Sequence, residues 1–104
     1  MTLEELYLII QNRKARMPKD SYVTSLFRDG KERIIQKVGE EAIEVVIAAK
    51  GNNKKRIIEE TADLWFHSLV LLSLYTITPS DILSELKSRQ GKMNKKYAMI
   101  KKET

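Results

Sequence analysis

The sequence predicts an all-α protein of four main helices that pairs with a second copy of itself to form a helical bundle. Apolar residues recur three and four positions apart along most of the chain, which is the spacing of one helix face. The chain holds only four Gly and two Pro residues, so few positions interrupt a long helix. The one stretch that resembles a strand, residues 21–24, stands alone. With 104 residues, the chain is expected to form a single domain, residues 1–104, around one core.

The first predicted helix begins after Thr2, whose hydroxyl can cap it, and ends before Met17 and Pro18. Apolar residues at helical spacing follow the cap: Leu3, Leu6, Tyr7 and Ile10. Residues 19–30 are expected to form a loop or a short helical turn that ends at Gly30.

The second and third helices are expected over residues 31–50 and 53–75, with a helix stop and a turn between them. The expected apolar face of the second helix is Ile34, Ile35, Val38, Ala42, Val45, Val46 and Ala49. The third helix becomes apolar on nearly every side through Leu64, Trp65, Phe66, Leu69, Val70, Leu71, Leu72 and Leu74. Three partner helices from so small a chain cannot cover such a helix on every side. A second copy of the chain would cover it, so we expect a homodimer.

The fourth helix has a clear start. Thr78 is a suitable N-cap, Pro79 takes the first helical position and Asp81 lies in the first turn. Its apolar residues are expected to pack inward: Ile82, Leu83 and Leu86. Beyond Gly91 the pattern fades into Lys-rich sequence, which predicts a frayed or extended helix.

The composition excludes several kinds of site. There is no Cys, which removes disulfides, thiolate metal sites and Cys nucleophiles, and the single His excludes a His-rich zinc site. The net charge of +5 favours anionic partners such as nucleic acid, membrane surfaces or phosphorylated metabolites. The acidic N-terminus lacks the basic start of a signal peptide, and the longest apolar run, residues 64–75, is too short to span a bilayer. We therefore expect a cytoplasmic protein without a membrane partner.

Four carboxylates are placed symmetrically about Asn52 in the predicted turn. Glu44 and Glu60 lie eight residues to either side of it, and Glu41 and Asp63 lie eleven. In an antiparallel pair of helices the four would meet at the same height, and a spacing of three puts each pair on one helix face. Carboxylates that converge in this way repel one another, and a hard divalent cation relieves the repulsion. Oxygen ligands favour Mg²⁺, with Mn²⁺ as the alternative.

The same residues also fit two solvated helix faces with local ion pairs, such as Lys37 with Glu41 and Arg56 with Glu60. The second acidic pair at the mirrored distance favours a metal site over ion pairs alone. Two interpretations of His67 stay open: a histidine hydrogen-bonded within a packed helix, or one that touches a phosphate, orients a carboxylate or transfers a proton. No Gly-rich phosphate loop is present, so metal and side chains would have to hold any phosphates.

Two segments carry a family resemblance. The pattern Glu-Glu-x-x-Glu followed by Glu-x-x-Asp, which is typical of the MazG-like all-α nucleoside triphosphate pyrophosphohydrolases, is matched by Glu40, Glu41, Glu44, Glu60 and Asp63. Three further features resemble one family within that superfamily, the phosphoribosyl-ATP pyrophosphohydrolases of histidine biosynthesis. They are the lead-in Lys-Val-Gly at residues 37–39, the continuation His-x-Leu-Val-Leu-Leu at residues 67–72, and residues 21–26. One departure is Phe66, where this family often has Tyr.

The resemblance implies hydrolysis of phosphoribosyl-ATP to phosphoribosyl-AMP and pyrophosphate, the second step of histidine biosynthesis. It implies that Mg²⁺ is held by Glu41, Glu44, Glu60 and Asp63. Two catalytic residues follow from it: Glu40 would position or deprotonate the water or merely support the site, and Lys37 would hold a phosphate or neutralise the acids. Substrate contacts are expected from Ser21, Tyr22, Thr24, Lys37 and His67.

Three alternatives stay open. The first is a house-cleaning pyrophosphohydrolase of the same superfamily that acts on noncanonical or deoxy nucleotides. The second is a basic helical dimer that binds nucleic acid; it predicts salt-dependent binding of DNA or RNA and no need for Glu41 or Asp63, and we do not expect nucleic acid as a partner. The third is a purely structural four-helix dimer, which would bind no metal.

Overall fold

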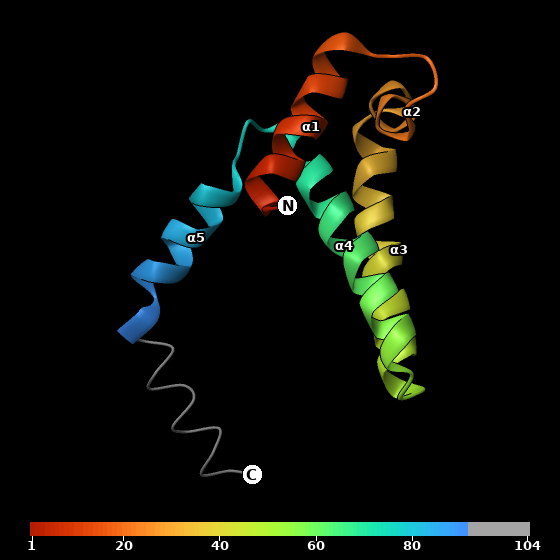
Figure 1. Ribbon diagram of the computed structural model, residues 1–104, viewed down its shortest axis with the longest axis vertical. Helices are drawn as coiled ribbons and strands as arrows, with labels where there is room; N and C mark the ends of the chain where they lie inside the picture. The colour runs from red at the N-terminus through yellow and green to blue at the C-terminus, as the bar shows by residue number, and fades with distance from the viewer. Residues whose placement is uncertain (92–104) are drawn as a thin grey trace.

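The computed structural model describes residues 1–91 as a chain of helices. The helices are α1 (Leu3–Arg16), α2 (Tyr22–Asp29), α3 (Lys31–Lys50), α4 (Lys54–Leu74) and α5 (Pro79–Ser88), shown in Figure 1. No strand occurs in the described part of the chain, and the prediction of an all-α fold is confirmed. The expected continuation of the last helix through the Lys-rich segment lies outside the described residues.

Side-chain caps set the starts of most helices. Thr2 accepts a hydrogen bond from the backbone N–H three positions on, at 3.0 Å, and Asn53 does the same for α4 at 3.2 Å. Thr78 and Asp81 cap α5 reciprocally, each side chain accepting from the backbone N–H of the other. These caps satisfy N–H groups that no helical carbonyl reaches, which is why the bounds of these helices can be predicted from local sequence.

The short helix α2 is more regular than the loop or single turn that we expected. Ser21 caps it through a 3.3 Å hydrogen bond from the N–H of Thr24, and Gly30, at a φ of 100°, ends it. Eight residues make a marginal helix in isolation. Here Val23, Thr24 and Leu26 are buried against the rest of the fold, so tertiary packing stabilises a helix that its own sequence does not secure.

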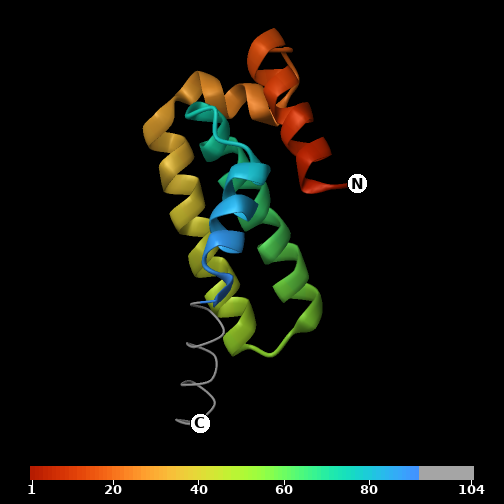
Figure 2. The same ribbon diagram turned by 90° about the vertical axis from the view of Figure 1, so that its left-hand side faces the viewer.

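An antiparallel hairpin of α3 and α4 forms the long axis of the molecule (Figures 1 and 2). Its turn is at Gly51 and Asn52, and Asn52 takes the left-handed conformation with a φ of 57°. The helices α1 and α2 pack at the opposite end of the hairpin, where the apolar core lies. That core consists of Tyr7, Ile10, Val23, Leu26, Ile34, Leu69 and Val70. Among the helices of residues 1–91, the half of the hairpin nearer the turn is therefore a contact of α3 with α4 only.

The face of α3 that meets α4 differs from the predicted apolar face. Ile34, Glu41 and Ala48 are the buried residues of this helix, and they lie seven positions apart. Ile35 and Val46, both assigned to the inward face, are exposed. The prediction is confirmed for Ile34 and was wrong for Ile35, Val46 and Ala49, because apolar residues occur on two sides of α3 and only one side is covered by α4. A carboxylate is consequently part of the contact between the two helices.

The last helix, α5, also departs from the prediction, because Ile82, Leu83 and Leu86 do not pack inward. They are exposed and line an open apolar groove together with Leu3 and Trp65. The cause is the path of the chain: α5 leaves α4 at a bend of 99° and stands apart from the hairpin (Figure 1). Within the described residues no single helix is long and apolar enough to cross a membrane, and only α4 and α5 taken together pass that test.

A buried hydroxyl in the core offers a test of the packing. The side chain of Thr24 is fully buried, and its Oγ1 has no hydrogen-bond partner among the described residues. Thr24→Val removes this unpaired oxygen and keeps the branched shape, so we expect the free energy of unfolding to rise by about 1 kcal/mol. Urea denaturation measures the change. Thr24→Ala is the control and should lower stability, because it leaves a cavity; a loss with Val as large as that with Ala would contradict the packing described here.

Candidate functional site

Three carboxylates converge midway along the hairpin. Glu41 comes from α3, and Glu60 and Asp63 come from α4; one oxygen of each lies within 4.8 Å of the other two. The symmetry of the sequence about the turn accounts for this meeting, since antiparallel helices bring equidistant positions to the same height. Glu41 is 8% exposed, Glu60 is half-buried and Asp63 is exposed. The group thus extends from the helix contact to the surface and offers hard oxygen donors, which suit Mg²⁺ or Mn²⁺.

The fourth predicted acid, Glu44, is not a member of this group in the structure. It is half-buried on α3, one turn closer to the hairpin turn than Glu41. The structure therefore brings together three of the four carboxylates that the sequence placed at one height. The role of Glu44 as a metal ligand stays a prediction.

Two cations accompany the carboxylates. The Nζ of Lys37 lies 3.0 Å from Oε1 of Glu41, and Nη2 of Arg56 lies 3.6 Å from Oε1 of Glu60. The hydrogen bond that Lys37 donates to Glu41 is the main cause that raises the pKa of Lys37 above its ordinary value; burial opposes it, and the nearby Tyr22 and Glu40 add to it. Both predicted ion pairs, Lys37 with Glu41 and Arg56 with Glu60, are therefore present. They involve two of the three carboxylates that also indicate a metal site.

Glu40 lies beside this group rather than in it. Its Oε1 accepts a 2.8 Å hydrogen bond from Nε2 of Gln36, and its carboxylate is 3.6 Å from Lys37 and 3.8 Å from Arg33. Neither oxygen belongs to the three-carboxylate group. Lys37 thus lies between Glu40 and Glu41 and links the predicted catalytic acid to the predicted metal ligands.

His67 is a buried residue that fixes Tyr22. Its Nδ1 lies 2.7 Å from the backbone carbonyl of Asp63, and its Nε2 lies 2.9 Å from the Tyr22 hydroxyl. A carbonyl oxygen only accepts, so Nδ1 carries a proton, and in the neutral imidazole Nε2 then accepts from the tyrosine hydroxyl. The Tyr22 ring, 51% exposed, is stacked on Phe66 with ring centroids 6.1 Å apart. Of the two interpretations of His67, the geometry favours the histidine bonded within the packed helix, and Tyr22 is the residue that meets solvent.

The other predicted substrate residues have structural tasks in the described chain. Ser21 caps α2 through its hydroxyl, and Thr24 is enclosed in the core. Their contacts with a substrate stay predictions. Sequence reasoning assigned no role to Arg13, Arg16 or Lys19, which line a pocket next to Ser21. The available signal was three basic residues at intervals of three just before and after Pro18, where the chain turns.

Comparison with known proteins agrees with the geometry. A family model described as phosphoribosyl-ATP pyrophosphohydrolase matches residues 3–90. The chain is 51% identical over 89 residues to the phosphoribosyl-ATP pyrophosphatase of Geobacter sulfurreducens, covering 86% of this chain and 82% of that protein. It is 46% identical over 90 residues to the protein of the same name from Methylibium petroleiphilum, covering 86% and 75%. The chain therefore belongs to the phosphoribosyl-ATP pyrophosphohydrolase family.

Proposed function

We propose that this chain hydrolyses phosphoribosyl-ATP to phosphoribosyl-AMP and pyrophosphate, the second step of histidine biosynthesis, in the cytoplasm. The observation that carries the proposal is the meeting of Glu41, Glu60 and Asp63 within 4.8 Å, in a chain of this family. Phosphoanhydride hydrolysis places several negative charges beside an incoming water, and an acidic group that binds cations is what such a reaction needs.

The three carboxylates fit a divalent metal ion. They are oxygen donors from two helices, and one of them is held in the helix contact, so their separation is defined by the fold. Glu41, Glu60 and Asp63 would hold Mg²⁺ or Mn²⁺, with Glu44 as a further ligand. When bound, such an ion shields phosphate oxygens and lowers the pKa of a coordinated water.

The chain's own residues would position the reactants. Lys37, whose pKa is raised chiefly by Glu41, stays charged at neutral pH and would contact a phosphate oxygen with a proton on Nζ that Glu41 does not use. Glu40, fixed by Gln36, would accept a hydrogen bond from the attacking water and orient it. Tyr22, held by His67 at the exposed edge of the site, would contact the substrate through its ring.

We also infer that the chain works as a homodimer. The face of α4 beyond the core leaves Trp65 55% exposed, and the same apolar surface continues through Ile58 on α4 and Leu83 on α5. Contiguous apolar surface of this kind is typical of a protein interface. Continuity across two helices of one chain favours a self-complementary contact with a second copy.

The proposed activity is tested by assaying the purified chain with Mg²⁺ on phosphoribosyl-ATP and on a panel of ordinary, deoxy and noncanonical nucleoside triphosphates. We expect kcat/KM to be highest for phosphoribosyl-ATP, with pyrophosphate as a product. A preference for any other nucleotide of the panel would support the house-cleaning alternative instead.

The acidic group is tested by Glu41→Gln, Glu60→Gln and Asp63→Asn. Each change keeps the shape and removes one anionic ligand, so we expect kcat to fall by about two orders of magnitude or more. Millimolar Mg²⁺ or Mn²⁺ should raise the melting temperature of the unaltered protein, because the ion binds only the folded site. The same shift should be lost in Asp63→Asn.

Glu59→Gln is the matched control for these variants. Glu59 is exposed, adjoins Glu60 in sequence and points about 100° away from it on the helix. It should leave both kcat and the metal-dependent shift in melting temperature unchanged. A Glu59 effect equal to that of Glu60, or the absence of any shift with metal, would count against the site.

Trp65→Ala and Leu83→Ala test the dimer. Both side chains are exposed in the single chain, so their truncation should spare its fold and weaken association, by about 30-fold for the tryptophan. Sedimentation velocity over a range of concentrations measures the change. An unaltered protein that is a monodisperse monomer at micromolar concentration would refute the dimer.

A further inference from the structure

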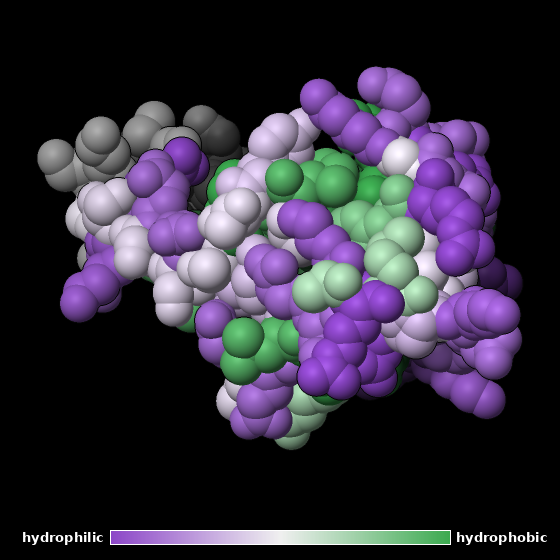
Figure 3. Space-filling view, turned by 90° about the horizontal axis from the view of Figure 1, so that it is seen from above, coloured by the Kyte–Doolittle hydropathy of each residue, from purple (hydrophilic) through white to green (hydrophobic). Residues whose placement is uncertain are grey.

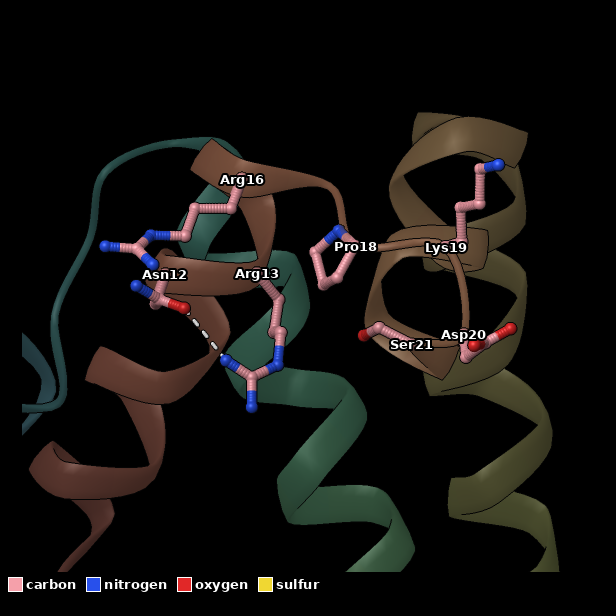
Figure 4. A pocket seen from close by; sticks show the side chains of 7 residues that line it. All are labelled: Asn12, Arg13, Arg16, Pro18, Lys19, Asp20 and Ser21. Carbon is pink, nitrogen blue, oxygen red and sulfur yellow. Dashed lines mark hydrogen bonds between the residues drawn. The ribbon is translucent and has the colours of Figure 1, made fainter.

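A basic pocket lies between the end of α1 and the start of α2, apart from the three carboxylates. It has a volume of about 490 Å³, which is within the range of small-molecule sites. Its lining residues are Asn12, Arg13, Arg16, Pro18, Lys19, Asp20 and Ser21. Figure 4 shows the α1 residues on one side, residues 19–21 on the other and Pro18 between them. Figure 3, which looks onto this end of the molecule, shows hydrophilic side chains over much of it.

Three basic residues and one acidic residue line the pocket; in Figure 4 the charged ends of Arg16 and Lys19 extend away from each other, and that of Arg13 lies between them. Arg13, Arg16 and Lys19 make no ion pair with any carboxylate within residues 1–91, although Asp20 lines the same pocket. The basic residues of the hairpin behave differently, since Lys37 and Arg56 are both paired there. The pocket therefore keeps a positive charge that the described chain does not neutralise.

The donors of this pocket suit a phosphate monoester. Arg13 is half-buried, and its Nη1 donates to Oδ1 of the exposed Asn12 at 2.8 Å, which leaves the other N–H groups of the guanidinium for a ligand. Guanidinium groups match phosphate oxygens in pairs, and a lysine ammonium adds a point charge. The start of α2, at Ser21, adds the positive end of a helix dipole to the same wall.

Short contacts connect the pocket to the acidic group. Ser21 in the pocket wall adjoins Tyr22, whose hydroxyl bonds His67, and His67 bonds the carbonyl of Asp63. The pocket wall is therefore connected to the helical turn of Asp63 through Tyr22 and His67. A substrate that carries phosphate at two separate ends is the ligand that fits an acidic, metal-binding site and a basic pocket linked in this way.

We propose that this pocket binds the phosphate monoester of the phosphoribosyl group while the acidic group receives the triphosphate. The inference rests on the proposed function, because phosphoribosyl-ATP is the substrate with both groups. It assigns Arg13, Arg16 and Lys19 as residues that determine specificity: nucleoside triphosphates without a phosphoribosyl group leave the pocket empty and gain nothing from these cations.

Steady-state kinetics with the full chain and Mg²⁺ test this assignment through Arg13→Gln, Arg16→Gln and Lys19→Gln. Losing one charged hydrogen-bond donor to the phosphate should raise KM for phosphoribosyl-ATP about 10- to 100-fold and change kcat little. Hydrolysis of ATP itself should keep its kcat/KM. Arg13→Lys keeps the positive charge but lacks the paired N–H donors of a guanidinium, so its KM should lie between that of the unaltered protein and that of Arg13→Gln.

Arg28→Gln and Lys54→Gln are the matched controls, because each removes one exposed positive charge from a residue outside the pocket. Neither should alter KM. An equal rise in KM with these controls would mean that the cations act only by general electrostatic attraction, and would overturn the assignment. An unchanged KM in the variant with all three pocket substitutions would also overturn the assignment, but it would leave the proposed function intact.

A direct measurement separates this inference from the activity. Ribose 5-phosphate, added without metal or nucleotide, should shift the NMR amide signals of residues 12–22, and ribose should not. The triple variant should lose the shifts. If ribose 5-phosphate binds here and phosphoribosyl-ATP is not hydrolysed, the phosphate pocket stands and the proposed function fails. No shift with ribose 5-phosphate, or tighter binding of a single-stranded oligonucleotide through the same cations, would overturn the inference.

Discussion

The acidic group is built around a carboxylate that is buried between two helices. Glu41 lies in the contact of α3 with α4, where an unpaired charge would be strongly unfavourable. Lys37, one turn earlier on the same helix, approaches it to 3.0 Å and makes the burial tolerable. On the α4 side of this contact, the carboxylates of Glu60 and Asp63 approach that of Glu41.

The helix α4 then relates the acidic group to the rest of the molecule. One turn beyond Asp63, His67 enters the core and holds Tyr22, and α2 is thereby tied to the hairpin at the point where it begins. Further along, Leu69 and Val70 join the core formed with α1 and α2. The helix α4 thus supplies two of the three carboxylates and the histidine that bonds the exposed tyrosine. It also supplies apolar residues to the core against which α1 and α2, the helices on either side of the basic pocket, are packed.

The extent to which the sequence predicts this arrangement depends on whether the information is local. The caps at Thr2, Asn53 and Thr78 act within one turn, so helix starts follow from neighbouring residues. The short helix α2, the covered side of α3 and the divergence of α5 depend on distant packing, which periodicity alone does not reveal. At the site, mirrored spacing predicted the convergence, while spacing of four predicted the ion pairs. The structure contains both the converging carboxylates and the ion pairs, so the sequence alone could not decide between a metal site and ordinary ion pairs.

The charge balance of the acidic group explains why ion pairs and a metal site are compatible. Glu41 and Glu60 each meet one cation, whereas Asp63 has no ion pair with a basic side chain among residues 1–91. Lys37 is moreover shared with Glu40, so its charge is divided between two carboxylates. The cations stabilise the buried end of the group and leave its exposed end negative. Because the buried carboxylate is paired with a cation, the protein can fold with its acids close together in the absence of metal. Because the exposed carboxylate is not paired in this way, its oxygens remain available at the surface to a divalent cation.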